Sequence, residues 1–227
     1  MLFRSTTAGF SVVTWTNTTF TNATVGHGLG ASPSLIITKS RNNTSGWLTW
    51  HSSIGSTQYL LLQTTGAAVT NASAFNGVSS TTFTLGDNSA WGVSGYTYVA
   101  YCFAAVAGYS AFGSYTGNGS TDGPFVYCGF RPRWVMIKAS SGSGSPGNQD
   151  WYVLDSSRDT YNLTANKLFP NSSNAENASP NTSTTNALDF LSNGFKLRTS
   201  NDGTNNGSNT YIFAAFAENP FKFSNAR

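Results

Sequence analysis

The most constraining feature of the sequence is an internal repeat. Three markers of the first half recur 99 positions later: Gly9-Phe10-Ser11 as Gly108-Tyr109-Ser110, Pro33 as Pro132, and Lys39 as Lys138. The constant spacing predicts one continuous register from the first marker to the last. Self-similarity of this length indicates a tandem duplication, in which one structural unit is encoded twice.

Further pairs extend the repeat toward the end of each half at slightly larger spacings. Trp47 and His51 correspond to Trp151 and Asp155 with an offset of 104 (151 − 47), and Phe83 and Thr97 correspond to Phe195 and Thr210 with offsets of 112 and 113. The extra residues fall in glycine- and serine-rich loops, where insertions are tolerated. The halves share a boundary near Gly108 with no linker, so we expect two units, residues 1–108 and 109–227, that are either packed closely or interleaved into one body.

The pattern of side chains predicts an all-β fold. Residues 9–20 alternate apolar and hydroxyl side chains, and residues 35–39 are a β-branched apolar run, so both segments are expected to be strands. Residues 96–112 are rich in β-formers between glycines and are expected to form one long strand. We therefore expect two tandem, sequence-related β-sandwich units of jelly-roll-like type. A long polar loop is expected at residues 64–80, with Phe75 plugging into the core.

The composition excludes several classes of protein. Hydrophobic residues make up 39% of the chain, enough for a packed core, whereas charged residues make up only 9%, against roughly 25% in an ordinary soluble domain. Hydroxyl and amide side chains must therefore solvate the surface. The net charge is +3, but lysine and arginine are scattered singly, so we expect no nucleic-acid partner.

The sequence shows no signal for a membrane or for secretion. No apolar run approaches the ~20 residues of a spanning helix, and the opening MLFRSTTAGF lacks the apolar core of a signal peptide. We expect no membrane insertion. Cys102 and Cys128 stand at non-equivalent positions of the repeat, which favours free, buried thiols in a reducing cytosol, although pairing between them stays open.

Residue types suited to catalysis do not form a recognisable arrangement. His27 and His51 have no cysteine or carboxylate at metal-ligand spacing, and the replacement of His51 by Asp155 favours a surface-pointing position at a strand end. Six carboxylates sit in turns or at strand ends, where they bond their own backbone: Asp87, Asp122, Asp155, Asp189, Asp202 and Glu218. We expect no catalytic residue, no metal and no cofactor.

Two alternatives for the carboxylates remain open. Paired carboxylates of a glycoside hydrolase are one. A calcium site that uses Asp87-Asn88 or Asp202-Gly203 is the other, although no known calcium spacing is present. The glycine-rich segment 117–123 has turn chemistry and lacks the Lys-Ser/Thr of a phosphate loop.

Three residues are candidates for contact at the surface. Four tryptophans are considered as sugar platforms: Trp47, Trp50, Trp91 and Trp151. Trp47 and Trp151 stand at equivalent positions of the repeat, which favours a common core role. Trp91 lies in a polar loop and has no counterpart in the second half, which makes it the best candidate, with a tucked anchor of that loop as the alternative. Arg131 and Arg133 are the only closely spaced arginines. They are interpreted as two solvated charges beside a turn, with a phosphate or acidic-sugar site as the alternative.

Long specific segments resemble a family of tailed-bacteriophage virion proteins. These are HGLGASPSLIITKSR, GYTYVAYCFAAVAGYSAFGSYTGNGSTDGPFVYCGFRPRWVMIK, DFLSNGFKLR and TYIFAAFAENPFK, so that the resemblance covers the chain from about Gly9 to Lys222. The related proteins are tail-fibre-like or concanavalin-like appendage proteins. The resemblance implies a non-enzymatic, β-rich virion component that is assembled in the host cytoplasm and exposed on the particle. It also implies a homo-oligomer, with a trimer favoured, that contacts other virion proteins.

Three functional hypotheses follow, in this order. The first is a tail-fibre or appendage module that presents loops 64–80, 86–95 and 140–150 to a host-surface glycan or protein receptor. The second is a decoration protein that stabilises the capsid or tail through its strands. The third is an appendage enzyme that degrades polysaccharide. Exposed aromatic side chains in loops would favour the first, a flat apolar patch on a rigid sheet face the second, and two carboxylates facing each other across a cleft the third.

Overall fold

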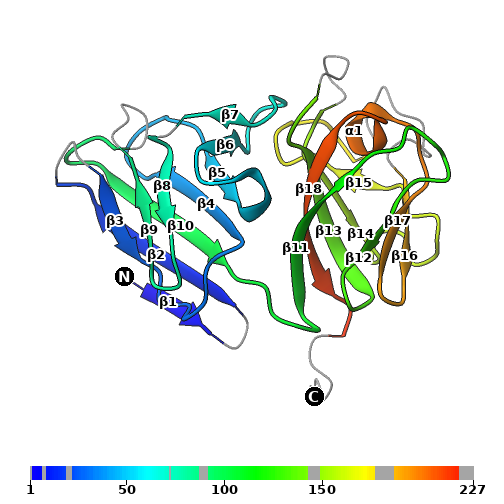
Figure 1. Ribbon diagram of the computed structural model, residues 1–227, viewed down its shortest axis with the longest axis horizontal. Helices are drawn as coiled ribbons and strands as arrows, with labels where there is room; N and C mark the ends of the chain where they lie inside the picture. The colour runs from blue at the N-terminus through cyan, green and yellow to red at the C-terminus, as the bar shows by residue number, and fades with distance from the viewer. Residues whose placement is uncertain are drawn as a thin grey trace. The chain divides into compact units, whose positions relative to one another are not determined.

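The computed structural model describes residues 2–6, 9–18, 22–71, 73–86, 92–142, 149–176 and 187–219. Its strands pair antiparallel throughout, and the described residues include one α-helix, of four residues (Figure 1). The predicted all-β fold is confirmed. The chain divides into two compact units, Met1–Gln63 with Ala68–Val106, and Thr64–Ala67 with Ala107–Arg227. They are called the first and second unit below.

The first unit contains a seven-stranded and a three-stranded sheet. The large sheet has the order β1-β2-β10-β4-β5-β6-β7 and the small sheet the order β3-β9-β8. The strands are β1 (Leu2–Ser5), β2 (Phe10–Thr16), β3 (Ala23–Gly26), β4 (Leu35–Ser40), β5 (Leu48–His51), β6 (Gln58–Leu61), β7 (Val69–Thr70), β8 (Phe75–Val78), β9 (Thr82–Leu85) and β10 (Thr97–Phe103), with a 3-10 turn at Ser52–Ile54.

The second unit contains a five-stranded and a three-stranded sheet. The large sheet has the order β11-β18-β13-β14-β15 and the small sheet the order β12-β17-β16. The elements are β11 (Ser110–Thr116), β12 (Phe125–Tyr127), β13 (Pro132–Ala139), β14 (Tyr152–Asp155), β15 (Lys167–Leu168), β16 (Leu188–Leu191), β17 (Gly194–Leu197), α1 (Asp202–Asn205) and β18 (Thr210–Ala217).

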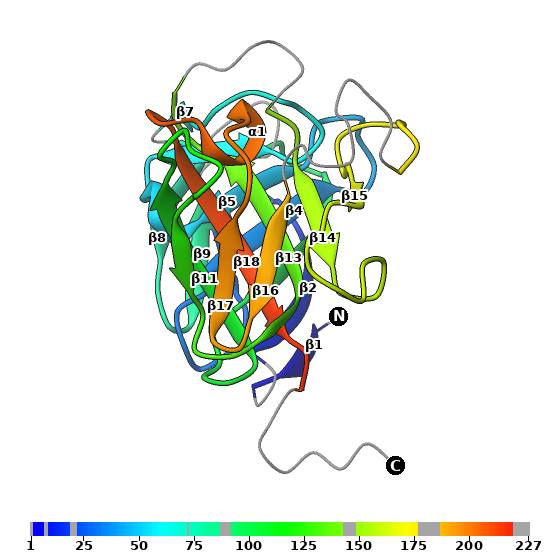
Figure 2. The ribbon, with the colours of Figure 1, turned by 90° about the vertical axis from the view of Figure 1, so that its right-hand side faces the viewer.

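The two sheets of the second unit enclose one core. Side chains alternate along each strand, so every second residue points inward. Val126 of β12 and Phe195 of β17 meet Val135 of β13 and Phe213 of β18 in a single buried cluster. Figure 2 looks onto this unit, with β16 and β17 over β13 and β18. The small sheet therefore buries one face against the large sheet and presents the other to solvent.

The strand orders of the two units correspond except for β1 and β7, which have no counterpart in the second unit. The order β2-β10-β4-β5-β6 matches β11-β18-β13-β14-β15, and β3-β9-β8 matches β12-β17-β16. The registers show where the predicted constant offset fails. Phe103 faces Phe10, and Phe216 faces Ser110, so β2 and β11 are offset by 100 (110 − 10). The offset returns to 99 at Leu35 and Trp134. The intervening loops differ in length, and this breaks the register expected to be continuous.

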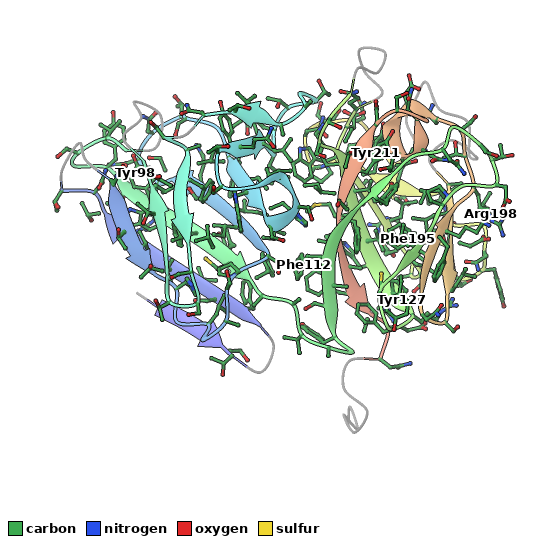
Figure 3. All side chains as sticks on the ribbon, in the orientation of Figure 1. Tyr98, Phe112, Tyr127, Phe195, Arg198 and Tyr211 are labelled. Carbon is green, nitrogen blue, oxygen red and sulfur yellow. The ribbon has the colours of Figure 1, made fainter. Side chains whose placement is uncertain are left out.

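An aromatic cluster recurs at equivalent core positions. In the first unit Trp15 stacks on Tyr98, with ring centroids 5.3 Å apart, and meets Phe83 edge-on at 5.8 Å. In the second unit Tyr115 stacks on Tyr211 at 5.1 Å and meets Phe195 edge-on at 6.1 Å. Figure 3 labels Tyr98 in the first unit and Phe195 and Tyr211 in the second. Each cluster ties the small sheet of its unit to the large one.

Two predictions about segments need correction. Residues 64–80 do not form one loop, because β7 and β8 lie within them. Phe75 is fully buried, as predicted, but it is the first residue of β8 and not a plug from a loop. Residues 96–112 are not one strand either. β10 ends at Phe103 and β11 begins at Ser110, with positive-φ Gly108 in the turn between them, where glycine avoids the steric cost.

A candidate binding face on the small sheet of the second unit

The small sheet of the second unit exposes aromatic side chains on its outer face. β12 is an edge strand that pairs with β17, and Val126 at its centre points into the core. Phe125 and Tyr127 on either side therefore point outward, with 44% and 69% of their surfaces exposed. Large aromatic residues bury their rings when the fold allows it, so two exposed rings on one short strand are informative.

The strand register sets the outward residues in two rows. Phe125 lies opposite Lys196, which lies opposite Asp189. Tyr127 lies opposite Gly194, which lies opposite Leu191. We call these outward residues of β12, β17 and β16 the aromatic face.

Gly194 makes room for the ring of Phe125. A Cβ atom at this position would clash with the Val126 carbonyl oxygen and would lie 3.0 Å from Cζ of Phe125. The ring thus reaches diagonally across the sheet toward β17, as aromatic side chains do between neighbouring strands. Its outer surface forms a flat apolar platform.

A network of paired charges borders this platform. Lys196 Nζ lies 2.7 Å from Asp122 Oδ1, and Arg198 bridges the two acids, with Nε 2.6 Å from Asp189 Oδ2 and Nη1 3.5 Å from Asp122 Oδ1. Arg198 is labelled with Tyr127 in Figure 3. Two cations and two anions sum to zero charge. The hydrogen bond from Lys196, together with its charge, lowers the pKa of the exposed Asp122 carboxyl, so Asp122 is an ionised acceptor at neutral pH.

The opposite edge of the small sheet is covered by residues 161–164. The Asn162 side chain pairs with the backbone of Phe190, donating to its carbonyl at 3.0 Å and accepting from its amide at 3.0 Å. Thr164 forms an isolated bridge with Leu188. These contacts fix Tyr161 and Leu163 beside β16, where 85% and 39% of their surfaces are exposed.

Exposed apolar side chains are concentrated at this sheet. Six large hydrophobic side chains are exposed among the residues that the structure describes, and four lie on or beside the small sheet of the second unit: Phe125, Tyr127, Tyr161 and Leu163. The surface thus combines ring faces with ionised hydrogen-bonding groups. That combination suits a ligand with both an apolar face and hydroxyl groups.

The tryptophans considered as platforms that the structure describes, Trp47, Trp50 and Trp151, are not part of the aromatic face. Trp91, the preferred candidate, falls outside the described residues. Trp151 is buried, in agreement with the core role that its equivalence to Trp47 favours, and Trp50 is buried as well, so neither is a surface platform. Trp50 Nε1 donates to the Gly55 carbonyl at 2.7 Å. Trp47 is half-buried and its ring lies 6.5 Å from that of Tyr101.

Arg131 and Arg133 have separate partners. Arg131 forms an ion pair with Glu218, 2.9 Å from Nε to Oε2, and its Nη1 donates to the Phe190 carbonyl at 2.9 Å. Arg133 is exposed and donates to Ser157 Oγ at 2.8 Å. Arg131 therefore ties the residues around β13, β16 and β18 together, and it keeps little capacity for an external anion.

The two histidines have structural roles. His27 is fully buried; its Nδ1 accepts from the Leu29 amide at 3.2 Å, so its Nε2 carries the proton toward the Ser79 carbonyl, also at 3.2 Å. Burial lowers the pKa of His27, which keeps the ring neutral. His51 is buried as well, and its Nδ1 accepts from the Ser53 amide at 3.1 Å.

Asp155 has the same function as His51 at the equivalent strand end. His51 faces Leu35 and Asp155 faces Trp134, in agreement with the predicted pairing of these positions. Asp155 Oδ1 accepts from the amides of Ser157 and Arg158. The expected surface-pointing position is wrong, because both side chains turn back to cap the segment that follows the strand and are buried by it.

The remaining candidate carboxylates divide into three groups. Asp122 and Asp189 are brought together by Arg198 at the aromatic face, and Asp189 lies within β16 and not in a turn. Asp202 lies in the first turn of α1. Asp87 falls outside the described residues. The structure thus supports turn chemistry for Asp155 and corrects it for Asp189.

Cysteines and metals add no further site. Cys102 is buried and Cys128 half-buried, both are free thiols, and burial raises the pKa of each to about 12. Over the described ranges, no three His, Cys, Asp or Glu side chains gather closely enough to hold a metal ion. Among those same residues no helix has the length and hydropathy needed to cross a membrane.

A comparison of the two halves in the correct register would have identified the aromatic face from the sequence. Using the registers of β3 with β9 and β12 with β17, Phe125 and Tyr127 replace Thr24 and Gly26. A constant offset of 99 instead pairs Phe125 with Gly26, and this hides the substitution of threonine by phenylalanine.

Comparison with known proteins places the chain in a family without assigning it an activity. A family model described as a domain of unknown function, DUF7483, matches residues 2–220. No curated protein and no solved structure matches the chain. Because the family model spans nearly the whole sequence, the chain belongs to the DUF7483 family.

Proposed function

We propose that this chain is a structural protein of a tailed-phage virion, and that it acts as a tail-fibre or appendage module that contacts the host surface. The observation that carries this proposal is the aromatic face. It lies on a sheet and not in a loop, but its ion pairs, Lys196 with Asp122 and Arg198 with Asp189, distinguish it from the flat apolar patch expected of a decoration protein. Phe125 and Tyr127 are exposed on a sheet whose other face is packed into the core, so they are held rigidly in place for contact. The resemblance to phage virion proteins provides the setting.

We further infer that the two units are jelly-roll-like β-sandwiches that arose by tandem duplication. The matching strand orders support this, as do the aromatic clusters around Tyr98 and Tyr211 and the caps at His51 and Asp155. A duplicated frame allows one copy to keep a structural surface while the other acquires a binding surface.

The charge arrangement favours binding over hydrolysis at the aromatic face. A glycosidase needs one protonated carboxyl and one free carboxylate across a sugar. Asp122 and Asp189 instead share Arg198, and the pKa of Asp122 is lowered, not raised. The two carboxylates therefore serve as fixed charges in an ion-pair network and not as an acid and a base.

The proposed partners are other virion proteins, further copies of this chain and a host-surface glycan or protein. A homotrimer is the favoured assembly and the particle surface the expected location. Weakly charged, hydroxyl-rich surfaces suit such assemblies, since burying an unpaired charge at an interface costs several kcal/mol.

Imaging of the intact phage with an antibody against this chain tests the proposal. Label at the distal end of a tail appendage is the expected result. Regular label over the capsid lattice would instead identify a decoration protein that stabilises the particle. Absence of the chain from purified particles would overturn the virion assignment altogether.

A further inference from the structure

We propose that the aromatic face binds a glycan built from uncharged pyranose sugars, an inference that names the ligand class for the contact surface of the proposed function. A pyranose ring carries C–H groups on one face and hydroxyl groups around its rim. The aromatic face offers a matching pair of features, an apolar platform and a bordering row of charged donors and acceptors.

The aromatic platform matches the apolar C–H face of a pyranose ring. The Phe125 ring extends over Gly194, so its outer side is open, and Tyr127 stands two residues away on the same side of the strand. Residues i and i+2 of a strand are about 7 Å apart. That spacing suits two contacts with one sugar or with neighbouring sugars of a chain, each through stacking of C–H groups on a ring.

The charged side chains match the hydroxyl groups around the rim of the sugar. Asp122 is 79% exposed at its side chain and ionised, so it accepts hydrogen bonds from sugar hydroxyls, and Lys196 beside it donates them. Adjacent carboxylate and ammonium groups match two vicinal hydroxyls, which each donate and accept. This geometry requires no charge on the ligand.

Charge balance distinguishes neutral from acidic sugars. Both cations of the face are paired within it, Lys196 with Asp122 and Arg198 with Asp189 and Asp122. A carboxylated or sulfated sugar would have to displace an acid from its cation, and it would meet the unscreened charge of that acid. A neutral sugar leaves all these pairs in place.

The same charges argue against a protein as occupant. The centre of a protein interface is depleted of charged residues, and a buried ion pair loses its hydration there. On the aromatic face the ion-paired residues Lys196 and Asp189 lie in the middle of the sheet, between Phe125 at one edge and Leu163 at the other. A hydrated ligand keeps such groups solvated.

A glycan array probed with the full chain tests this inference. The array carries neutral hexose and N-acetylhexosamine oligosaccharides together with sialylated, uronic-acid and sulfated ones. We expect binding to members of the neutral set, weakened at least about tenfold by Phe125→Ala and by Tyr127→Ala, each corresponding to loss of one ring contact. Thr24→Ala, at the position of the first unit equivalent to Phe125, is the matched control and leaves binding unchanged.

Two accompanying measurements keep the test decisive. Thermal unfolding shows whether each variant is folded, and Tyr127→Ala serves if Phe125→Ala fails to fold, since Tyr127 is the more exposed of the two. Sedimentation of wild type and variants reports on a second copy as occupant. A shift in oligomeric state on Tyr127→Ala would identify a protein contact and overturn the inference.

The remaining outcomes separate this inference from the proposed function. Binding confined to acidic glycans, binding insensitive to both substitutions, or no binding to any glycan would each contradict the inference, even if imaging places the chain on a tail appendage. Neutral-glycan binding that depends on Phe125 and Tyr127 would support it even if imaging places the chain on the capsid, where the appendage proposal fails.

Discussion

The outer faces of the two small sheets differ far more than the frames that carry them. In the first unit the face bears Thr24, Gly26, Thr82 and Thr84, with the hydroxyls of Thr24 and Thr84 3.1 Å apart. In the second unit the equivalent positions hold Phe125, Tyr127, Gly194 and Lys196. The inward residues of the same strands are Val25 and Phe83 in the first unit and Val126 and Phe195 in the second, and all four are buried. Residues that hold the core are alike, and residues free of the core have diverged.

This difference indicates where function lies. Packing constrains inward side chains, because a core at close packing penalises changes of even one methylene. Outward side chains are free of that constraint. An aromatic pair that appears on one outer face only is therefore more informative about binding than any buried residue.

Truncating the equivalent core phenylalanines should give the largest effect. Phe83 and Phe195 are both fully buried in their aromatic clusters. We expect Phe83→Ala and Phe195→Ala each to lower the unfolding free energy by about 3–5 kcal/mol. Denaturant titration of the full chain measures both. A loss below about 1 kcal/mol at either site would break the equivalence of the two cores.

Lys138, one of two fully buried lysines that the structure describes in the second unit, should make stability depend on pH. Lys138 is fully buried, with Nζ donating to the carbonyls of Ala139 and Gln149, and burial lowers its pKa to about 8. An unfolded lysine titrates near 10.4. Between these values the unfolded chain binds a proton at this lysine that the folded chain lacks, so Lys138 should contribute a rise of up to about 3 kcal/mol to the unfolding free energy from pH 8 to pH 10. The raised pKa values of Cys102 and Cys128 act in the opposite direction over this range, so the contribution of Lys138 is measured as the difference between wild type and a variant that lacks it. Below pH 8 the full penalty is present.

Substitution of this lysine isolates the effect. Lys138→Met should remove this contribution in urea titrations, so that the unfolding free energy of the variant changes less favourably between pH 8 and pH 10 than that of the wild type. Lys39→Met, at the equivalent position in the first unit, is the matched control and should retain the rise. An unchanged slope in Lys138→Met would show that other groups cause it.

The two core tyrosines should differ by one hydrogen bond. The Tyr211 hydroxyl donates to the Asp202 carbonyl at 2.6 Å and accepts from the Asn206 amide at 2.8 Å, whereas the Tyr98 hydroxyl accepts from the Val93 amide at 3.2 Å. We expect Tyr211→Phe to cost about 2 kcal/mol and Tyr98→Phe about 1 kcal/mol. Calorimetric unfolding of the two variants ranks them. The opposite ranking would show that α1 is not held by Tyr211.

Placing the aromatic pair on the first unit should have the smallest effect on stability. Thr24 is exposed, and a Cβ atom at Gly26 would have the Thr81 carbonyl oxygen at 3.9 Å as its one neighbour, so both positions accept larger side chains. The double substitution Thr24→Phe with Gly26→Tyr should change the unfolding free energy by no more than about 0.5 kcal/mol. A loss above about 2 kcal/mol would mean that the outer face is part of the fold.

The sequence predicted the arrangement of strands well because strands produce a periodic pattern of apolar residues. Apolar alternation identified the all-β class, and the matches at Lys39 and His51 agree with the registers of β4, β5, β13 and β14. The loops between β2 and β4 and between β11 and β13 have no such periodic pattern. Their unequal lengths change the offset from 100 at β2 and β11 to 99 at β4 and β13, and only the hydrogen-bond register reveals it.

The candidate site was missed for a related reason. Among the aromatic residues, the tryptophans were considered as platforms, and Trp91 was the preferred one. Phe125 and Tyr127 stand in a strand pattern that is typical of core residues. Their outward direction depends on the burial of Val126 between them, which requires knowledge of the opposing sheet. The charge network is equally non-local, since Asp122, Asp189 and Arg198 come from three separate segments.

A chemical-shift map of the full chain, titrated with the neutral oligosaccharide that binds best on the array, tests the central claim most directly. The account predicts perturbed backbone amides in β12, β17 and β16 and unperturbed amides in β3, β9 and β8, which share the frame but lack the rings. Perturbations centred on the first unit, or spread evenly over both, would contradict it.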